Sequence, residues 1–255
     1  MNTELIQKLH LEIEPVGIFF GNTDAECDLI PDPSHKNCLV PLLMSAAKGK
    51  VIALDENNCN CPGGAVGCCF GDGFTRLNPD ISKLLSQGYG DDLPAGRPEF
   101  MRDGERFYVC EELAEKWRHD FPYSDKAYPR TVFAPVSRWK DIGTPDIVYI
   151  FADPDQISAL VILLGSHTGR AVNTIAPFGS ACQSIAYAQK ETDSNDPMAV
   201  MGLFDISQRY DALAGYLSMT LPYCLWENIN YDLDKSCLTT HAWKIIEKRM
   251  TKEEK

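Results

Sequence analysis

The chain has 255 residues, of which 44% are hydrophobic, so it is long enough to bury one large core or two small ones. Its formal net charge is −12, and a chain this acidic repels phosphate backbones, which argues against nucleic-acid binding. The N-terminal sequence has no basic leader before an apolar block, and the longest apolar run, at 157–165, is too short to span a bilayer, so we expect a cytoplasmic protein with no membrane partner.

Patterns typical of strands and helices alternate along the chain. Apolar runs that end at turn residues predict strands, and apolar residues at helical spacing between capping residues predict helices. The expected elements of the first half are a helix at 3–10, a strand at 14–22, a helix at 37–50, a strand at 50–57, a helix at 80–90, a helix or strand-to-helix segment at 105–121 and a strand at 131–139.

The second half of the chain contains the clearest strand-to-helix unit, at 146–165. Asp153 is the expected N-cap of its helix, and Pro154 occupies the first helical position. A loop with Pro177 and Gly179 then opens a helix at Ser180, which carries Cys182 in its first turn. The remaining elements are a strand and polar turn at 199–212, a strand-to-helix segment at 216–229 and an amphipathic helix at 236–250.

The alternation predicts an α/β fold, or an α+β fold, in which helices pack on a mixed sheet. We expect a single domain over residues 1–255, with a two-lobed organisation and a boundary near 120–140 left open.

Cysteines are the most unusual feature of the composition. The chain has ten of them, and a reducing compartment argues against disulfides and favours a metal or redox site. Residues 57–73, NNCNCPGGAVGCCFGDG, place four cysteines on a glycine-rich loop, in which residues 62–64 are expected to form a tight turn. The four are Cys59, Cys61, Cys68 and Cys69. Small buried apolar residues are the simpler interpretation for Cys27, Cys110, Cys224 and Cys237.

Cysteines elsewhere in the chain occupy places comparable with this loop. Cys38 and Cys182 each open a predicted helix, where negative charge is stabilised and a thiol ionises more easily. The glycines at 63, 64 and 67 let backbone N–H groups approach sulfur, and hydrogen bonds to sulfur help to set a reduction potential. These features suit an iron–sulfur cluster, and we expect Cys38, Cys61 and Cys182 to converge on one site.

The cysteine spacing C-x-C-x6-C-C matches neither the ferredoxin runs nor the usual zinc pairs. Three alternatives therefore stay open. The first is a metal-binding or sensor module without catalysis, the second is a thiol–disulfide redox site, and the third is a glycine-rich turn with incidental cysteines.

Several segments together resemble a large prokaryotic group, domain-of-unknown-function family 169. They are EPVGIFF, NCLVPLLMSAAKGK, CNCPGGAVG, PDIVYIFADPDQ, APFGSACQSI, DISQR, LSMTLPY and SCLTTHAWKIIEKR. The resemblance covers most of the chain and implies a cytoplasmic protein of bacteria or archaea, often anaerobes. The cysteines of this chain that match the family pattern are Cys38, Cys61 and Cys182, and in the family Cys59 often accompanies them. Where the family commonly has Leu-Gly, this chain has Cys68 and Cys69.

These observations predict an iron–sulfur cluster-binding protein with a redox role, either electron transfer or reduction of a small molecule. The favoured ligands are Cys38, Cys59, Cys61 and Cys182, with Cys68 and Cys69 as further members of the site and Gly63 and Gly64 as N–H donors. Cys59 and Cys61 are expected to matter more than Cys68 and Cys69, because the chain should turn away beyond Gly67. A redox partner protein or a small molecule is the expected partner, and a homo-oligomer stays open. No pattern identifies a catalytic residue, so an oxidoreductase activity also stays open.

Overall fold

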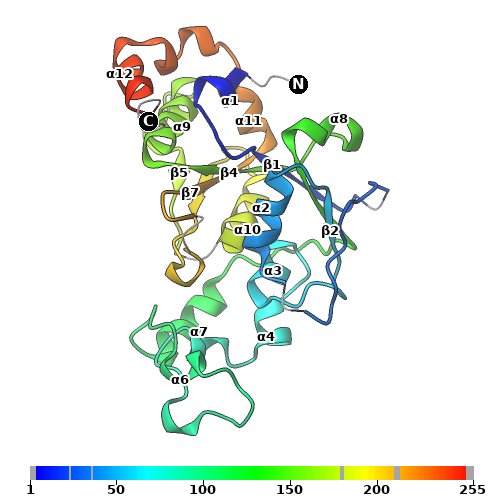
Figure 1. The fold of residues 1–255 in the computed structure, drawn as a ribbon. Helices are drawn as coiled ribbons and strands as arrows, with labels where there is room; N and C mark the ends of the chain where they lie inside the picture. The colour runs from blue at the N-terminus through cyan, green and yellow to red at the C-terminus, as the bar shows by residue number, and fades with distance from the viewer. Residues whose placement is uncertain (1–3, 23, 36, 179–180, 210–212, 251–255) are drawn as a thin grey trace.

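A mixed sheet of seven strands forms the centre of the molecule (Figure 1). The computed structural model describes residues 4–22, 24–35, 37–178, 181–209 and 213–250. The strands are β1 (Val16–Phe20), β2 (Ile52–Leu54), β3 (Thr131–Pro135), β4 (Ile147–Ala152), β5 (Thr174–Ile175), β6 (Ala199–Gly202) and β7 (Leu217–Pro222). They lie in the order β2-β3-β1-β4-β7-β6-β5. All neighbours are antiparallel except β5 and β6, so the expected mixed sheet is confirmed.

Helices cover both faces of this sheet. The helices of the described residues are α1 (Glu4–Lys8), α2 (Leu39–Ala47), α3 (Pro62–Gly67), α4 (Gly73–Leu77), α5 (Ile81–Leu84), α6 (Phe100–Asp103), α7 (Glu111–Asp120), α8 (Trp139–Ile142), α9 (Pro154–Ser166), α10 (Ala181–Glu191), α11 (Tyr223–Ile229) and α12 (His241–Met250), and only some of them contact the sheet. Helices α1, α9, α11 and α12 lie on one face, and α2, α3 and α10 lie on the other (Figure 1).

Strand β4 shows how the sheet separates two cores. Val148 and Ile150 face the core beneath α9 and α11, whereas Ile147, Tyr149 and Phe151 face the core beneath α2 and α10. Successive side chains of a strand point to opposite faces, so a strand covered on both sides needs a continuous apolar run. The sequence of β4 is such a run, and every residue of it is buried.

The loop between β4 and α9 has the predicted capping residues. The Asp153 carboxylate accepts the backbone N–H of Gln156 at 2.8 Å, and the Gln156 side chain accepts the N–H of Asp153 at 2.8 Å. Pro154 begins the helix. This reciprocal pair satisfies N–H groups that have no partner inside the helix, so the local sequence alone determines where α9 starts.

Helices α4, α6 and α7 lie beyond α3, on the side away from the sheet (Figure 1). A small aromatic core holds this region together. Phe74 of α4 packs edge-on against Phe121, with ring centroids 5.6 Å apart, and also contacts Trp117 of α7. This core continues into Val66 of α3, so the region is anchored on the cysteine segment. A boundary near 120–140 stays a prediction.

The observed elements differ from the expected ones in a few places. Residues 62–64 begin a helix and do not form an isolated tight turn. Residues 105–110 form neither strand nor helix, and α7 begins only at Glu111. The expected helix at 236–250 is divided into a short 3-10 turn and α12. Residues 1–3, 179–180 and 210–212, which include the expected helix opening at Ser180, lie outside the described residues.

Candidate functional site at the cysteine helix

The cysteine-rich loop contains a short helix, α3, which starts directly after Cys61. Cys61 is its N-cap in an extended conformation, and Pro62 occupies the first helical turn. The Cys61 carbonyl accepts the N–H of Ala65 at 2.8 Å. Proline is favoured at this position because its fixed φ suits a helix and its missing N–H is not needed there. The glycines of this helix are poor helix formers, but burial of Ala65 and Val66 in two cores outweighs that preference.

A tight polar loop places Cys59 ahead of this helix. Asp55 follows the buried strand β2, and its carboxylate accepts the N–H of Asn58 at 3.0 Å while the Asn58 side chain accepts the N–H of Asp55 at 2.9 Å. The N–H of Cys59 then donates to the Asp55 carbonyl at 3.0 Å. The Cys59 side chain is 2% exposed, so the loop points this thiol into the protein.

The other end of α3 carries the two adjacent cysteines. Cys68 is the C-cap, and Cys69 has a left-handed backbone with φ of 61°. The N–H of Cys69 donates to Val66 at 3.1 Å, and the N–H of Phe70 donates to Ala65 at 2.8 Å. These bonds form a Schellman cap, whose left-handed position usually holds glycine. The cap sends the thiols of Cys68 and Cys69 to different surroundings.

The Cys68 thiol returns to the start of the loop. It is fully buried and donates a hydrogen bond to the Cys59 sulfur, which lowers the pKa of Cys59 and raises that of Cys68, where burial is the larger cause. The expectation that the chain turns away after Gly67 is therefore wrong. Residues 62–67 form a helix and not a tight turn, and this helix brings Cys68 back beside Cys59.

The Cys69 thiol lies elsewhere. Burial raises its pKa to about 11, and a hydrogen bond with Ser124 opposes this. Its other electrostatic neighbours are Asp146, Lys126 and Lys190. The structure thus separates the adjacent pair, with Cys68 on the side of Cys59 and Cys69 on the side of Ser124.

Cys38 approaches Cys61 from a distant part of the chain. Cys38 is the N-cap of α2 and is half-buried. Burial raises the pKa of Cys61 to about 11, the N–H groups of Gly64 and Gly63 oppose that rise, and the charges of Cys38 and Cys59 add to it. The backbone N–H groups of Gly63 and Gly64 thus lie beside the Cys61 sulfur.

Cys182 joins the group because α10 packs closely on α3. A Cβ atom at Gly67 would lie only 2.4 Å from the Cys182 carbonyl oxygen, so only glycine permits this approach. Cys182 is 6% exposed, and its charge contributes to the raised pKa of Cys68, for which burial is the main cause. We call Cys38, Cys59, Cys61, Cys68 and Cys182 the thiol cluster.

The remaining cysteines lie outside the thiol cluster. The Cys27 sulfur accepts a hydrogen bond from Arg130 at 2.8 Å. Cys224 is exposed on α11, and Cys237 packs at the edge of the core on that same side of the sheet. Within the described ranges, no three His, Cys, Asp or Glu side chains are grouped so that they could hold a single metal ion.

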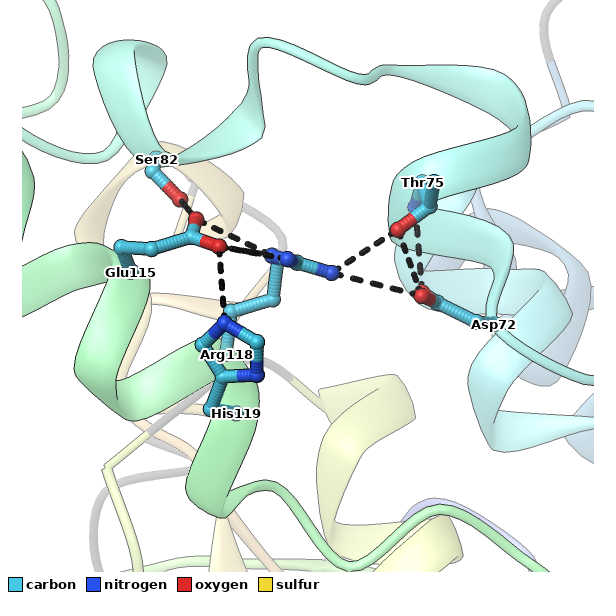
Figure 2. A network of polar contacts seen from close by, with 6 residues as sticks. All are labelled: Asp72, Thr75, Ser82, Glu115, Arg118 and His119. Carbon is cyan, nitrogen blue, oxygen red and sulfur yellow. Dashed lines mark hydrogen bonds and ion pairs between the residues drawn. The ribbon is translucent and has the colours of Figure 1, made fainter.

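A network of charged side chains that the sequence did not indicate fastens α7 to α4 (Figure 2). The Arg118 guanidinium contacts Glu115 of its own helix, and it donates to Thr75 at 2.8 Å and to Asp72 at 3.4 Å. Asp72 caps α4, which follows the cysteine helix directly. Gly73, at the start of α4, packs against Pro62, so this brace supports the outer side of α3. Its residues are Asp72, Thr75, Ser82, Glu115, Arg118 and His119.

Comparison with known proteins identifies a family. The model of the DUF169 family, described as uncharacterised ArCR, matches residues 4–230, nearly the whole chain. No curated protein and no solved structure matches the chain. None of the helices formed by the described residues is both long and apolar enough to cross a membrane. The extent of the family match shows that the chain belongs to the DUF169 family.

Proposed function

We propose that this protein binds an iron–sulfur cluster at the thiol cluster and serves as a redox protein. The observation that carries the proposal is that buried or half-buried thiols from three separate segments lie around α3, near enough for the charge of one to affect the pKa of another. Thiolates are the usual ligands of such clusters. Cys38, Cys59, Cys61 and Cys182 are the proposed ligands, and Cys68 is a further candidate through its contact with Cys59.

The surroundings of the thiols support an all-sulfur site. Soft thiolate ligands favour iron–sulfur clusters over ions that prefer oxygen. The N–H groups of Gly63 and Gly64 face Cys61, and a Cβ atom at Gly64 would lie 3.4 Å from the Cys59 sulfur and 3.6 Å from the Cys61 sulfur. Glycine therefore leaves room beside two thiols. A cluster distributes its ligands over several metal atoms, so its thiolates lie further apart than those around a single ion.

A bound cluster would supply one-electron transfer, and the protein's own residues would hold it and shield it from water. The proposed role is electron transfer to a redox partner protein or reduction of a small molecule. We place this activity in a reducing cytoplasm, because exposed or half-buried thiols such as Cys38 and Cys61 persist there without forming disulfides.

One contact favours a second candidate function, that of a thiol–disulfide redox protein. The Cys59 sulfur accepts a hydrogen bond from Cys68, so this pair combines a thiol of lowered pKa with an adjacent resolving thiol. Such a pair is the arrangement of redox-active dithiols. Burial of both side chains argues against rapid exchange with a protein substrate, so we rank this function second.

Anaerobic purification followed by iron and sulfide analysis tests the two functions. The cluster proposal predicts a brown protein with iron and acid-labile sulfide, and loss of most of that iron in Cys61→Ser. Cys224→Ser is the matched control, because this exposed cysteine lies on the opposite face of the sheet. A colourless protein without iron, or full iron in each of the Cys38, Cys59, Cys61 and Cys182 variants, contradicts the proposal. A colourless protein that forms a Cys59–Cys68 disulfide on mild oxidation would support the second function.

A further inference from the structure

The residue between the two cysteines of the C-x-C pair, Asn60, joins the cysteine loop to the segment that precedes α2. Its side-chain oxygen accepts the backbone N–H of Asn37 at 2.8 Å. Its side-chain nitrogen donates to the carbonyl of Pro33 at 3.1 Å and to the carbonyl of His35. An asparagine amide has one oxygen acceptor and two N–H donors, so every polar group of this side chain is used on that one segment.

Asn37 makes the matching contacts from the other side. Its side-chain nitrogen donates to the Asn58 carbonyl of the cysteine loop at 3.4 Å and to the Asp32 carbonyl of its own segment at 2.9 Å. We call Asn37 and Asn60 the asparagine clasp. The clasp therefore fastens two distant parts of the chain by side-chain amides that each bond the backbone of the other segment.

The segment that the clasp holds is a turn with its own internal bonds. The Asp32 carboxylate accepts the N–H of Ser34 at 2.8 Å, and the N–H of His35 donates to the Asp32 carbonyl at 3.2 Å. Such an Asp turn forms from local sequence alone. The side chains of Asp32 and His35 are exposed, so water can reach this turn and the fold does not need the clasp to satisfy buried polar groups.

The clasp instead fixes the places of three cysteines. Asn37 directly precedes Cys38, and Asn60 lies between Cys59 and Cys61. Consecutive Cα atoms are about 3.8 Å apart, so a bond between the two asparagines holds the backbone of Cys38 close to that of the C-x-C pair. Cys38 also packs against the apolar core that contains Cys59. The half-buried thiols of Cys38 and Cys61 thus lie on the side of the thiol cluster that the clasp closes.

We infer that Asn60 is a positioning residue that holds Cys38 beside the C-x-C pair, so that cysteines from both segments can ligate one cluster. This inference rests on the proposed iron–sulfur function and deepens it, because it assigns the placement of a ligand to a residue that is not a ligand. Groups that hold metal ligands in place typically change metal affinity about 10- to 100-fold when they are lost. Asn60→Ala should therefore weaken retention of the cluster.

Alkylation of the metal-free protein by iodoacetamide, followed at each cysteine by mass spectrometry, tests the clasp without the cluster. In Asn60→Ala we expect Cys38 to react about five to ten times faster than in wild type, the change that about one net hydrogen bond makes in an opening equilibrium. Cys182, which is buried at the start of α10, should keep its rate, whereas a general loss of structure would raise both rates. Asn37→Ala should accelerate Cys38 by less, because its backbone N–H still donates to Asn60.

The same variants test the ligand role in anaerobically purified protein. The rate at which iron is lost to the chelator EDTA should rise about tenfold in Asn60→Ala. Asn57→Ala is the matched control in the same loop, because Asn57 is exposed and its backbone N–H, which donates to the Asp55 carboxylate at 2.8 Å, survives the substitution. Both rates should stay at their wild-type values in this control.

The two readouts separate the role of Asn60 from the cluster function. Faster alkylation of Cys38 alone, together with faster loss of iron, supports the inference. An unchanged rate at Cys38 in a protein that contains iron overturns the role of Asn60 and leaves the cluster function standing. A rise at Cys38 and Cys182 together means a purely structural role and also overturns it, as does faster alkylation of Cys38 with unchanged loss of iron. A wild-type protein without iron overturns both proposals.

Discussion

Replacement of Gly67 by alanine tests whether contact with α3 seats Cys182. The new Cβ atom would lie 2.4 Å from the Cys182 carbonyl oxygen and 3.1 Å from the carbonyl carbon. Ordinary contact begins at 3.4 Å, so α3 and α10 must separate by about 1 Å. The obstacle is backbone, which cannot rotate away as a flexible side chain would. The substitution therefore moves the start of α10 and the Cys182 thiol with it.

The size of the effect follows from two opposing contributions. Overpacking of a close contact costs about 1–3 kcal/mol. Alanine is a better helix former than glycine by roughly 0.5–1 kcal/mol, which offsets part of that cost. We expect Gly67→Ala to lower the free energy of unfolding of the metal-free protein by about 1–2 kcal/mol. Under the proposed function it should also lower the iron content.

Urea unfolding followed by circular dichroism, together with iron analysis, measures both effects. Gly215→Ala is the matched control, because its φ is not in the left-handed region and no atom lies within 4 Å of its Cβ position. A Gly67→Ala protein that is as stable as wild type and holds as much iron would refute the close seating of α10 on α3.

Two other substitutions test the outer brace and the helix cap. A hydrogen bond with Arg118 is the largest of the causes that lower the pKa of Glu115 from 4.5 to about 2. The ionised Glu115 carboxylate therefore contributes its full stabilisation above about pH 4.5, and this stabilisation is lost as the pH falls through 2. Because the Glu115 side chain is 40% exposed, we expect Glu115→Gln to lower the free energy of unfolding by only about 0.5–1 kcal/mol at pH 6, and by less at pH 3. A difference between variant and wild type that does not change with pH would contradict this. Cys69→Gly should keep the iron content of wild type and lie within about 1 kcal/mol of its stability, because relief of the left-handed strain at φ of 61° offsets the lost burial of the thiol. Loss of iron in this variant would place Cys69 among the ligands.

The sequence by itself determined the features that depend on neighbouring residues. The apolar run of β4 and the Asp153 capping box predicted β4 and the start of α9, because strand burial and helix capping are local in the chain. The position of the cysteine loop directly after β2 also followed from the sequence pattern.

Only the tertiary structure decided which thiols meet. The helical form of α3 depends on burial of Ala65 and Val66 in two cores, which overrides the weak helix propensity of its glycines and returns Cys68 to Cys59. The approach of Cys182 depends on a contact across more than a hundred residues, at Gly67. Periodicity tells which face of an element is buried, but not which element covers that face, so only the packing of α10 on α3 and the sheet decides where Cys182 lies.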